Sequence, residues 1–521
     1  MNLMRLTLEL AAHITFEETL HTSAKTLKYT ITRPPEQTLM SPKNRLNVRM
    51  DALIANKKMR TPLRLVVALA MIAGLSGCAL PWQKQWPKHE TPTVDVPATP
   101  TTLAPLSVDR EWWKAFGDAT LNDLVADALV NNLDLAKAAA TVAEARANAG
   151  AANAMLSPRA DALANTSASR RQLSVASQDL NHSTASTTAG VGISWEIDLW
   201  GRIRQLNEAS LARLAASEHT RNATVLSISS AVVETYFQLV ALDTNLRITQ
   251  DAERNLIQVS DLEKRRWKAD IGTELAYSQS LAELAAVETR IPGIEAAIAR
   301  TQLALAILVG RTPRQIAEPL ARSAAFAALA DMPSEFDSAL LLRRPDVASA
   351  EQMLAAANAD INATRAERFP RLNLALLTGL IASSSSAISG VPLYGDLSAG
   401  ISAPIYDAGL VQSKVDAATA RKDNAVAHYR YTVALAFRDV HTAMINRVAG
   451  DREVGAALNG LATRKQALAL TERSYVAGRS SKYEVLSETI DVLNAQTALT
   501  DARLIQFTAR VEFFKAIGGG L

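Results

Sequence analysis

The sequence predicts a mainly α-helical chain that also carries transmembrane β-strands, arranged as a tandem helix–strand–strand–helix repeat. The first observation is composition: only 5% of the 521 residues are aromatic, and alanine occurs in runs such as residues 138–140 and 355–357. This composition is typical of long, closely packed helices. The second observation is a stretch from 202 to 271 without glycine or proline, and the third is an internal repeat.

Long helices are predicted on both sides of the strands. The first runs from Leu121 to Leu156, where Ser157-Pro158 stops it. The stretch 202–271 would form a helix of about 105 Å. Gly272 then turns the chain, and a further helix is expected to reach Val309-Gly310. Apolar residues recur along the 202–271 stretch at the three- and four-residue steps of a coiled-coil seam. They are Val225, Ile228, Val232, Leu239, Leu242 and Leu246.

Two segments in each half of the chain alternate as β-strands do. In the first half they are residues 160–172 and 186–198, and the polar stretch 178–187 is expected to be a solvated loop between them. In the second half, apolar residues alternate along 372–376 and 397–405. Each strand has one apolar face and one small or polar face. This pattern fits a barrel whose outside meets lipid and whose lumen is wet.

The two halves align as a duplication. An offset of 212 places Asp134 on Asp346 and Pro158 on Pro370, and an offset of 208 places Gly201 on Gly409. The turn glycine Gly478 then corresponds to the turn at Gly272. We expect one repeat at residues 106–310 and the second at 311–521.

The N-terminal region predicts export and lipidation. Cys78, the only cysteine, ends the tetrapeptide 75–78 (LSGC), and a basic stretch and an apolar run precede it. This order is typical of a secretory signal peptide. The tetrapeptide resembles a bacterial lipoprotein lipobox, in which the cysteine is acylated and becomes the first residue of the mature chain. The other interpretation is a lone buried thiol.

Cleavage before Cys78 would make residues 1–77 a leader. Met50 and Met59 are both plausible starts, in which case residues 1–49 are an over-called reading frame. Residues 78–105 hold six prolines and are expected to form a lipidated, semi-extended tether.

The charge balance argues against a nucleic-acid partner. The chain has 55 basic and 52 acidic residues, of which 11 and 5 lie in residues 1–77. The mature chain therefore carries 44 and 47, a net charge of −3, and no basic face is expected. With one cysteine it forms no internal disulfide. No stretch after Cys78 is apolar for 18 residues, so no membrane-spanning helix is expected.

The inventory of reactive residues favours a protein without catalysis, metal or cofactor. The seven histidines do not pair at metal-ligand spacing, and no phosphate-binding loop or nucleophile elbow is present. The segment Arg343-Arg344-Pro345-Asp346 could form an anion site. A turn that starts a helix is favoured instead, because proline and an acidic residue both suit a helix N-terminus.

Four strands are too few to close a transmembrane barrel. The smallest transmembrane barrels have about eight strands, and unpaired edges are not tolerated in hydrocarbon. Either the strands pack as a soluble sheet on the helices, or several protomers pool them. The length of the helices favours a pooled barrel that continues into a conduit.

The segment Leu341-Leu342-Arg343-Arg344-Pro345-Asp346-Val347, followed by Phe369-Pro370, resembles the mid-chain signature of the outer membrane factor (TolC-like) family, and in particular its NodT-type efflux lipoproteins. The resemblance spans residues 106–521. Other matching landmarks are Trp113, Phe116, Asp118, Trp195 to Arg202, Pro404-Ile405-Tyr406 with Gly409, and Ala516 to Gly520.

The resemblance implies a homotrimer with a twelve-stranded β-barrel that continues into a long α-helical periplasmic tunnel. Such a protein is the outer-membrane exit duct of a tripartite efflux pump and passively conducts small molecules. Its partners would be a periplasmic adaptor protein, an RND-type inner-membrane pump and outer-membrane lipid. Two alternatives remain: an exit channel for protein secretion, and a lipid-tethered periplasmic coiled-coil scaffold.

By the same resemblance, the hairpin turns lie at the periplasmic tip, where the adaptor docks and the tunnel closes. The candidate contact residues are Gly272, Thr273, Glu274, Gly478, Arg479 and Ser480. Many family members carry an acidic residue just after the second turn glycine. This chain has Arg479 and Ser480 there, which puts an acidic gate at this position in doubt. A solvated turn without a special role is the alternative for each residue.

Overall fold

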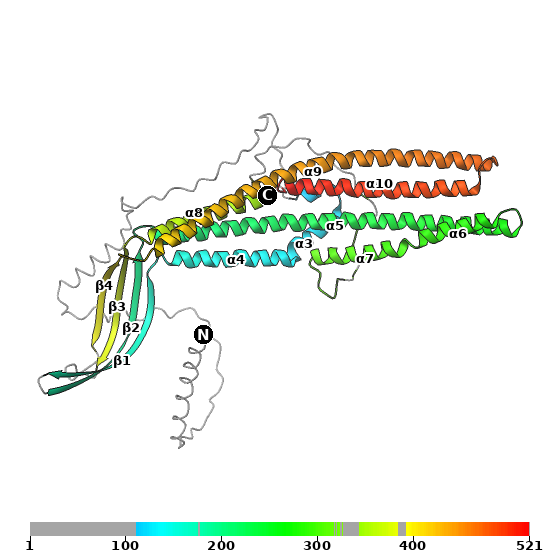
Figure 1. Ribbon diagram of the computed structural model, residues 1–521. Coiled ribbons are helices and arrows are strands. Elements are labelled where there is room, and N and C mark those ends of the chain that lie inside the picture. Colours follow the sequence, from blue (N-terminus) through cyan, green and yellow to red (C-terminus); the bar gives the residue numbers. More distant parts are fainter. Residues whose placement is uncertain are drawn as a thin grey trace, which may run out of the picture. The chain divides into compact units, whose positions relative to one another are not determined.

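The computed structural model describes residues 111–175, 178–316, 318, 320–323, 326, 343–383 and 392–519, all within one unit of the chain, Leu80–Leu521. The predicted leader 1–77, Cys78 and the tether 78–105 lie outside the described residues. A four-stranded antiparallel sheet, in the order β1-β2-β3-β4, stands at one end of the long helices, and the turns that join helix pairs stand at the other (Figure 1). The elements are η1 (Trp112–Phe116), α3 (Ala119–Asn131), α4 (Leu133–Ala154), β1 (Arg159–Val175), β2 (Gln178–Ile197), α5 (Arg202–Lys268), α6 (Glu274–Glu288), α7 (Ile291–Leu308), α8 (Pro345–Ala366), β3 (Arg371–Ser383), β4 (Leu393–Ser402), α9 (Leu410–Val476) and α10 (Lys482–Ala516).

The predicted duplication is confirmed element by element. Helices α4 and α8 both have 22 residues and start 212 positions apart. Helices α5 and α9 both have 67 residues and start 208 positions apart, each after a left-handed glycine, Gly201 or Gly409. The coiled-coil seam of α5 is also confirmed. Three of its residues, Ile228, Val232 and Leu239, are buried, and the other three pack against the same core.

Two predicted helices are interrupted in the structure. The helix expected over 121–156 breaks at Asn132, whose side-chain oxygen accepts hydrogen bonds from the backbone N–H groups of Asp134 (2.8 Å) and Leu135 (3.2 Å). An asparagine that caps the next helix in this way competes with helix continuation. The second helix, expected up to Val309, breaks between α6 and α7 close to Pro292, which cannot donate a backbone hydrogen bond.

The polar stretch 178–187, expected to be a loop, belongs to β2. Strands β1 and β2 stay paired from Arg159↔Ser194 to Val175↔Gln178. This stretch lacks apolar alternation, so sequence periodicity could not identify it as a strand. In the second half β4 ends at Ser402, short of the expected 405. Pro404 has no N–H group to extend the ladder.

The register of the sheet confirms two chemically distinct faces. One face, termed the apolar face, carries Val191, Ile193 and Trp195 of β2 opposite Thr378, Leu376 and Leu374 of β3. The other, termed the polar face, carries the alternate residues, which are mostly glycine, serine, threonine, asparagine and aspartate. On β1 and β2 these include Asp161, Asn165, Ser167, Ser186, Thr188, Gly190, Gly192 and Ser194.

On the polar face, β2 and β3 approach each other too closely for side chains at one point. Gly190 and Gly379 lie directly opposite each other on this face. A Cβ added to Gly379 would lie 2.5 Å from the Gly190 Cα and still closer to the Ala189 carbonyl oxygen. Glycine at both positions permits this close approach of two backbones.

A buried polar cluster joins α3 to α5 in the main core. The Asp118 carboxylate caps α3 by accepting hydrogen bonds from the backbone N–H groups of Thr120 and Leu121. It also accepts from the Tyr236 hydroxyl (2.6 Å) and the Ser323 hydroxyl (2.7 Å). The surrounding core contains Trp112, Phe116, Phe237 and Phe507. The cluster therefore ties three segments that are distant in the sequence.

By length and composition alone, two helical segments have an 18-residue window apolar enough to cross a membrane: Arg202–Lys268 and Glu274–Leu308. That no helix spans the membrane stays a prediction. The window in α5 is 61% buried, as in a core helix, whereas the window over α6 and α7 is only 11% buried.

Substitution of the paired glycine tests the close approach of β2 and β3. We expect Gly379→Ala to destabilise the sheet by about 1–3 kcal/mol, because the added methyl group meets backbone that cannot move aside. Gly395→Ala on β4 is the matched control, since nothing lies within 4 Å of its added Cβ. Loss of β-structure and of detergent-resistant assembly would be compared by circular dichroism and gel electrophoresis. Equal loss in both variants would contradict the assignment.

Removal of the Tyr236 hydroxyl tests the buried cluster. We expect Tyr236→Phe to cost about 1–3 kcal/mol of unfolding free energy, because the buried Asp118 and Ser323 groups lose a partner. Tyr429→Phe is the control. Its ring is also buried, and its hydroxyl makes no hydrogen bond among the described residues.

The effect of Tyr236→Phe on the free energy of unfolding should depend on pH. Burial, followed by the hydrogen bond to Asp118, raises the pKa of Tyr236 from 10.0 to about 12. Because the folded pKa lies above the unfolded value, the stability due to this proton is complete below pH 10 and is lost as the pH rises through 12. The stability difference between the wild type and Tyr236→Phe should therefore shrink between pH 10 and 12 in denaturant unfolding. A constant difference would contradict this account.

Candidate functional site

The hairpin turns at the ends of α5 and α9 have the same backbone geometry. In the first turn, the N–H of Ile271 donates to the Arg266 carbonyl (3.0 Å) and that of Asp270 donates to Trp267 (3.0 Å). In the second, Arg479 donates to Ser474 (2.8 Å) and Gly478 to Tyr475 (2.9 Å). This pair of bonds is the Schellman motif that ends helices. Both turns are therefore ordered, hydrogen-bonded structures.

The left-handed position differs between the repeats. It is Gly478 (φ 72°) in the second turn and Asp270 (φ 61°) in the first. The predicted correspondence of Gly478 with Gly272 was therefore wrong at the level of single residues, and Asp270 is the counterpart. Gly272 has a different requirement: a Cβ there would lie 2.9 Å from the Arg266 Cβ.

Each following helix begins with a hydroxyl cap. The Thr273 side chain accepts from the Ala276 N–H (3.1 Å), and the Ser481 side chain accepts from the Glu484 N–H (3.2 Å). Thr273 was among the predicted tip residues, and Ser481 ends the second predicted turn, 478–481. Ser481 and Glu484 have the S-x-x-E spacing of a capping box.

A small cavity of about 250 Å³ lies between the two turns. Gly272 and Thr273 line it from the first hairpin, and Ser480 lines it from the second, so these three predicted residues are brought together. Lys482 and Tyr483 of α10 also line it. The other predicted residues, Glu274, Gly478 and Arg479, lie in the described turns and helix starts but do not line this cavity.

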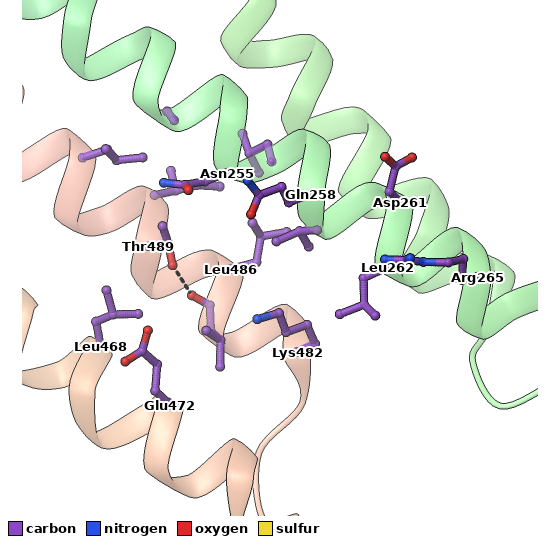
Figure 2. Close-up of a pocket in the computed structure, with 16 residues that line it drawn as sticks. Asn255, Gln258, Asp261, Leu262, Arg265, Leu468, Glu472, Lys482, Leu486 and Thr489 are labelled. Atoms are coloured by element: carbon purple, nitrogen blue, oxygen red, sulfur yellow. Dashed lines mark hydrogen bonds between the residues drawn. The ribbon is translucent and has the colours of Figure 1, made fainter.

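A larger cavity of about 660 Å³ lies next to it, between α5, α9 and α10 (Figure 2). Its polar side chains include Asn255 and Gln258 of α5, Glu472 of α9, and Lys482 of α10. The Lys482 amine also lies 5.2 Å from the centre of the Tyr475 ring, within the range of a cation–π contact. The cavity is a groove between hairpins with both polar and apolar lining, the latter including Leu256 and Leu486.

Apolar side chains in and around these cavities pack the two hairpins together. Leu256 of α5 and Leu486 of α10 are almost fully buried in one cluster with Ala252 and Val287. Basic residues occupy the last turn of α5, where they suit the negative end of the helix: Arg265, Arg266 and Lys268. Arg266 lies 3.4 Å from the buried carboxylate of Glu263.

The arrangement suits non-covalent docking and movement of hairpins. Leucine packing between hairpins can exist in two discrete states, whereas each turn is fixed by its own hydrogen bonds. Among the described residues, no group of three histidine, cysteine or acidic side chains is placed to hold a metal ion.

A family model described as "Outer membrane efflux protein" matches residues 124–311 and 338–519. The chain belongs to this family. The resemblance to outer membrane factors is thereby confirmed.

The signature segment around Arg344 has a structural role in the fold. Arg344 occupies the position directly before α8, and its guanidinium donates hydrogen bonds to Asp346 (2.8 Å), Asp439 (3.3 Å) and the Ala516 carbonyl (2.9 Å). These carboxylates hold the pKa of Arg344 above its usual value despite burial.

Named relatives agree with this assignment. The chain is 33% identical over 79% of its length to the pyoverdine export outer membrane protein OpmQ of Pseudomonas putida, and it covers 88% of that protein. It is 29% identical over 86% of its length to the toluene efflux pump outer membrane protein TtgC of Pseudomonas putida, and it covers 93% of that protein. The outer-membrane channel OprN matches with a TM-score of 0.75 and 26% identity, over 83% of this chain and 98% of OprN.

As a member of the outer membrane efflux family, the protein is an efflux channel of the outer membrane that extends into the periplasm. The sheet is its membrane part, and the long helices are its periplasmic part. The hairpin turns at the far end of the helices are therefore its periplasmic tip (Figure 1).

Exchange of the left-handed residues tests the turn geometry. We expect Asp270→Gly to stabilise the first turn by about 0.5–1 kcal/mol, because glycine adopts positive φ without a steric penalty. It also removes a negative charge from a helix C-terminus. The reciprocal control, Gly478→Asp, should destabilise the second turn by a similar amount. Hydrogen exchange at Ile271 and Arg479 measures both effects, and shifts of equal sign would contradict the assignment.

Proposed function

We propose that three copies of this chain pool their sheets into a twelve-stranded barrel and their helices into one tunnel. The observation that carries the proposal is that, among the described residues, each edge strand of the four-stranded sheet pairs on one side only: β1 with β2, and β4 with β3. In hydrocarbon every backbone N–H and C=O group must be paired, so such a sheet is stable only in a closed barrel. β4 of one protomer would pair with β1 of the next.

Exposed apolar surface on the helices supports the same assembly. The apolar window in Glu274–Leu308 is only 11% buried. Leu303 and Ile307 of α7 are 40% and 61% exposed, and Leu133 of α4 is 76% exposed. Burial of such surface against neighbouring protomers would contribute about 25 cal/mol per Å².

We further propose that the duct works with a periplasmic adaptor and an RND-type inner-membrane pump, and that it conducts small molecules passively without chemistry of its own. OpmQ and TtgC are named for pyoverdine export and toluene efflux, which favours small solutes over secreted proteins. The adaptor would dock on the tip, at the small cavity lined by Gly272, Thr273 and Ser480. Opening would separate Leu486 from Leu256.

Purification in detergent and planar-bilayer recording test the proposal. We expect a heat-modifiable trimer that conducts ions, because closure of the barrel needs three sheets and leaves a wet lumen. A monomer without conductance would overturn it and would favour the periplasmic scaffold. Growth of a strain that lacks the protein, challenged with toxic small molecules, separates efflux from protein secretion. Unchanged sensitivity together with retention of a secreted protein would favour secretion.

Cys78 is the proposed lipid anchor. We expect Cys78→Ser to abolish acylation of the mature N-terminus and to weaken outer-membrane retention, while the strands still form a barrel. Mass spectrometry of the N-terminal peptide and membrane fractionation measure the two effects. An unmodified wild-type cysteine would contradict the anchor, whereas complete loss of Cys78→Ser from the membrane would weaken the case for barrel insertion.

A further inference from the structure

We propose that Asp396, together with Asp161, gives the barrel lumen a preference for cations over anions. The proposal rests on the pooled barrel of the proposed function and names the residues that determine its selectivity. The selective position lies within the barrel itself, far from the periplasmic tip.

The sheet register places the two aspartates in one row. Asp161 of β1 pairs with Gly192 of β2, Gly192 pairs with Leu377 of β3, and Leu377 pairs with Asp396 of β4. Residues directly opposite in an antiparallel sheet point to the same side. The two carboxylates therefore stand on the same face, on the two strands that form the edges of the sheet.

That face is the polar one and would become the wall of the lumen, because a barrel in lipid turns its polar face inward. Gly190 and Gly379 lie in the next row of the same face. The opposite face carries leucine, isoleucine, valine and tryptophan, as a lipid-facing surface requires. In a closed barrel, β4 and β1 of adjacent protomers are neighbours, so the edge aspartates of adjacent protomers would approach one another.

Asp396 is not neutralised. It forms no ion pair with any of the described residues, and it is exposed. Asp161, in contrast, is paired with Arg159 (2.8 Å), and Glu196 near the base of the polar face is paired with Arg202 (2.9 Å). By register, Arg371 of β3, opposite Ser402, and Arg171 of β1, opposite His182, also belong to the polar face, several rows away from Asp396. Three copies of Asp396 would thus form a ring of carboxylates that no described basic residue pairs with.

Pore size decides whether such a ring can act. Twelve strands about 4.8 Å apart and tilted by about 40° give a barrel radius of about 12 Å. Inward side chains bring the carboxylates to within about 9 Å of the axis. The Debye length is about 10 Å at 0.1 M salt and about 3 Å at 1 M. The ring therefore acts across the whole pore at low salt and only near the wall at high salt.

Reversal potentials of the purified trimer in a KCl gradient test the inference. We expect the wild type to prefer K⁺ over Cl⁻, and Asp396→Asn to lower the permeability ratio roughly 2- to 5-fold at about 0.1 M salt. Asp161→Asn, which leaves Arg159 unpaired, should shift the ratio in the same direction. Arg371→Gln should shift it in the opposite direction. The differences should fade at about 1 M salt.

Ser398→Asn is the matched control, because it places an amide of the same size one row away on the same face without removing a charge. If Asp396→Asn and Asp161→Asn trimers still conduct and have the K⁺/Cl⁻ permeability ratio of the wild type, the inference is overturned. The proposed function as a duct would then still stand. An equal change in Ser398→Asn would also overturn the inference. A wild-type protein that neither trimerises nor conducts would instead overturn the proposed function, and the inference with it.

Discussion

Unpaired backbone at the edges of the sheet is the constraint on which the rest of the structure depends. Within the part of the chain that the structure describes, β1 and β4 each pair with one neighbouring strand, and the backbone groups of their outer edges have no strand partner. Lipid offers no partner either. The two-faced register has the same consequence, because an apolar face and a polar face on one sheet require lipid on one side and water on the other. Closure of the barrel by several copies meets both requirements. The architecture is therefore that of an assembly, of which one chain supplies a sector.

The long helices continue from the sheet into the periplasm. α5 and α9 each run for 67 residues, about 100 Å. α5 is fixed near its middle by the core around Phe116, Phe237 and Phe507 and by the Asp118–Tyr236–Ser323 cluster. α9 is fixed near its middle by a separate cluster, in which Val440 and Ala443 pack with Phe513 of α10. Beyond this point, the hairpins contact each other mainly through small apolar clusters such as that of Leu256 and Leu486. A rigid middle and a lightly packed tip suit a tunnel that must open only at its end.

Duplication explains both the likeness and the divergence of the two tips. The Schellman bonds and the hydroxyl caps recur at the same offset of 208, from Thr273 to Ser481. The left-handed residue does not recur, since Asp270 stands where Gly478 stands in the second repeat. The two turns therefore have the same backbone conformation but differ in charge. Such a difference allows the two hairpins to have separate roles at the tip.

The sequence by itself determined the features that depend on local pattern. The repeat, the long helix α5, the turns and the alternation of the strands follow from periodicity and from the positions of glycine and proline, because these act through neighbouring residues. The place of Gly272, Thr273 and Ser480 at the tip came instead from the family resemblance. Local pattern could not identify the end of a helix at Asn132, since the Asn132 amide donates to the Leu308 carbonyl, 176 residues away.

Only the tertiary structure decided which distant residues meet. The polar stretch 178–187 is a strand because β1 pairs with it, and nothing in its own alternation requires this. Asp118 reaches Tyr236 across 118 residues, and Asp161 shares a row with Asp396 only through the pairing of β2 with β3. Strand register and core contacts join residues that are far apart in the chain, and periodicity within one segment carries no information about its partner.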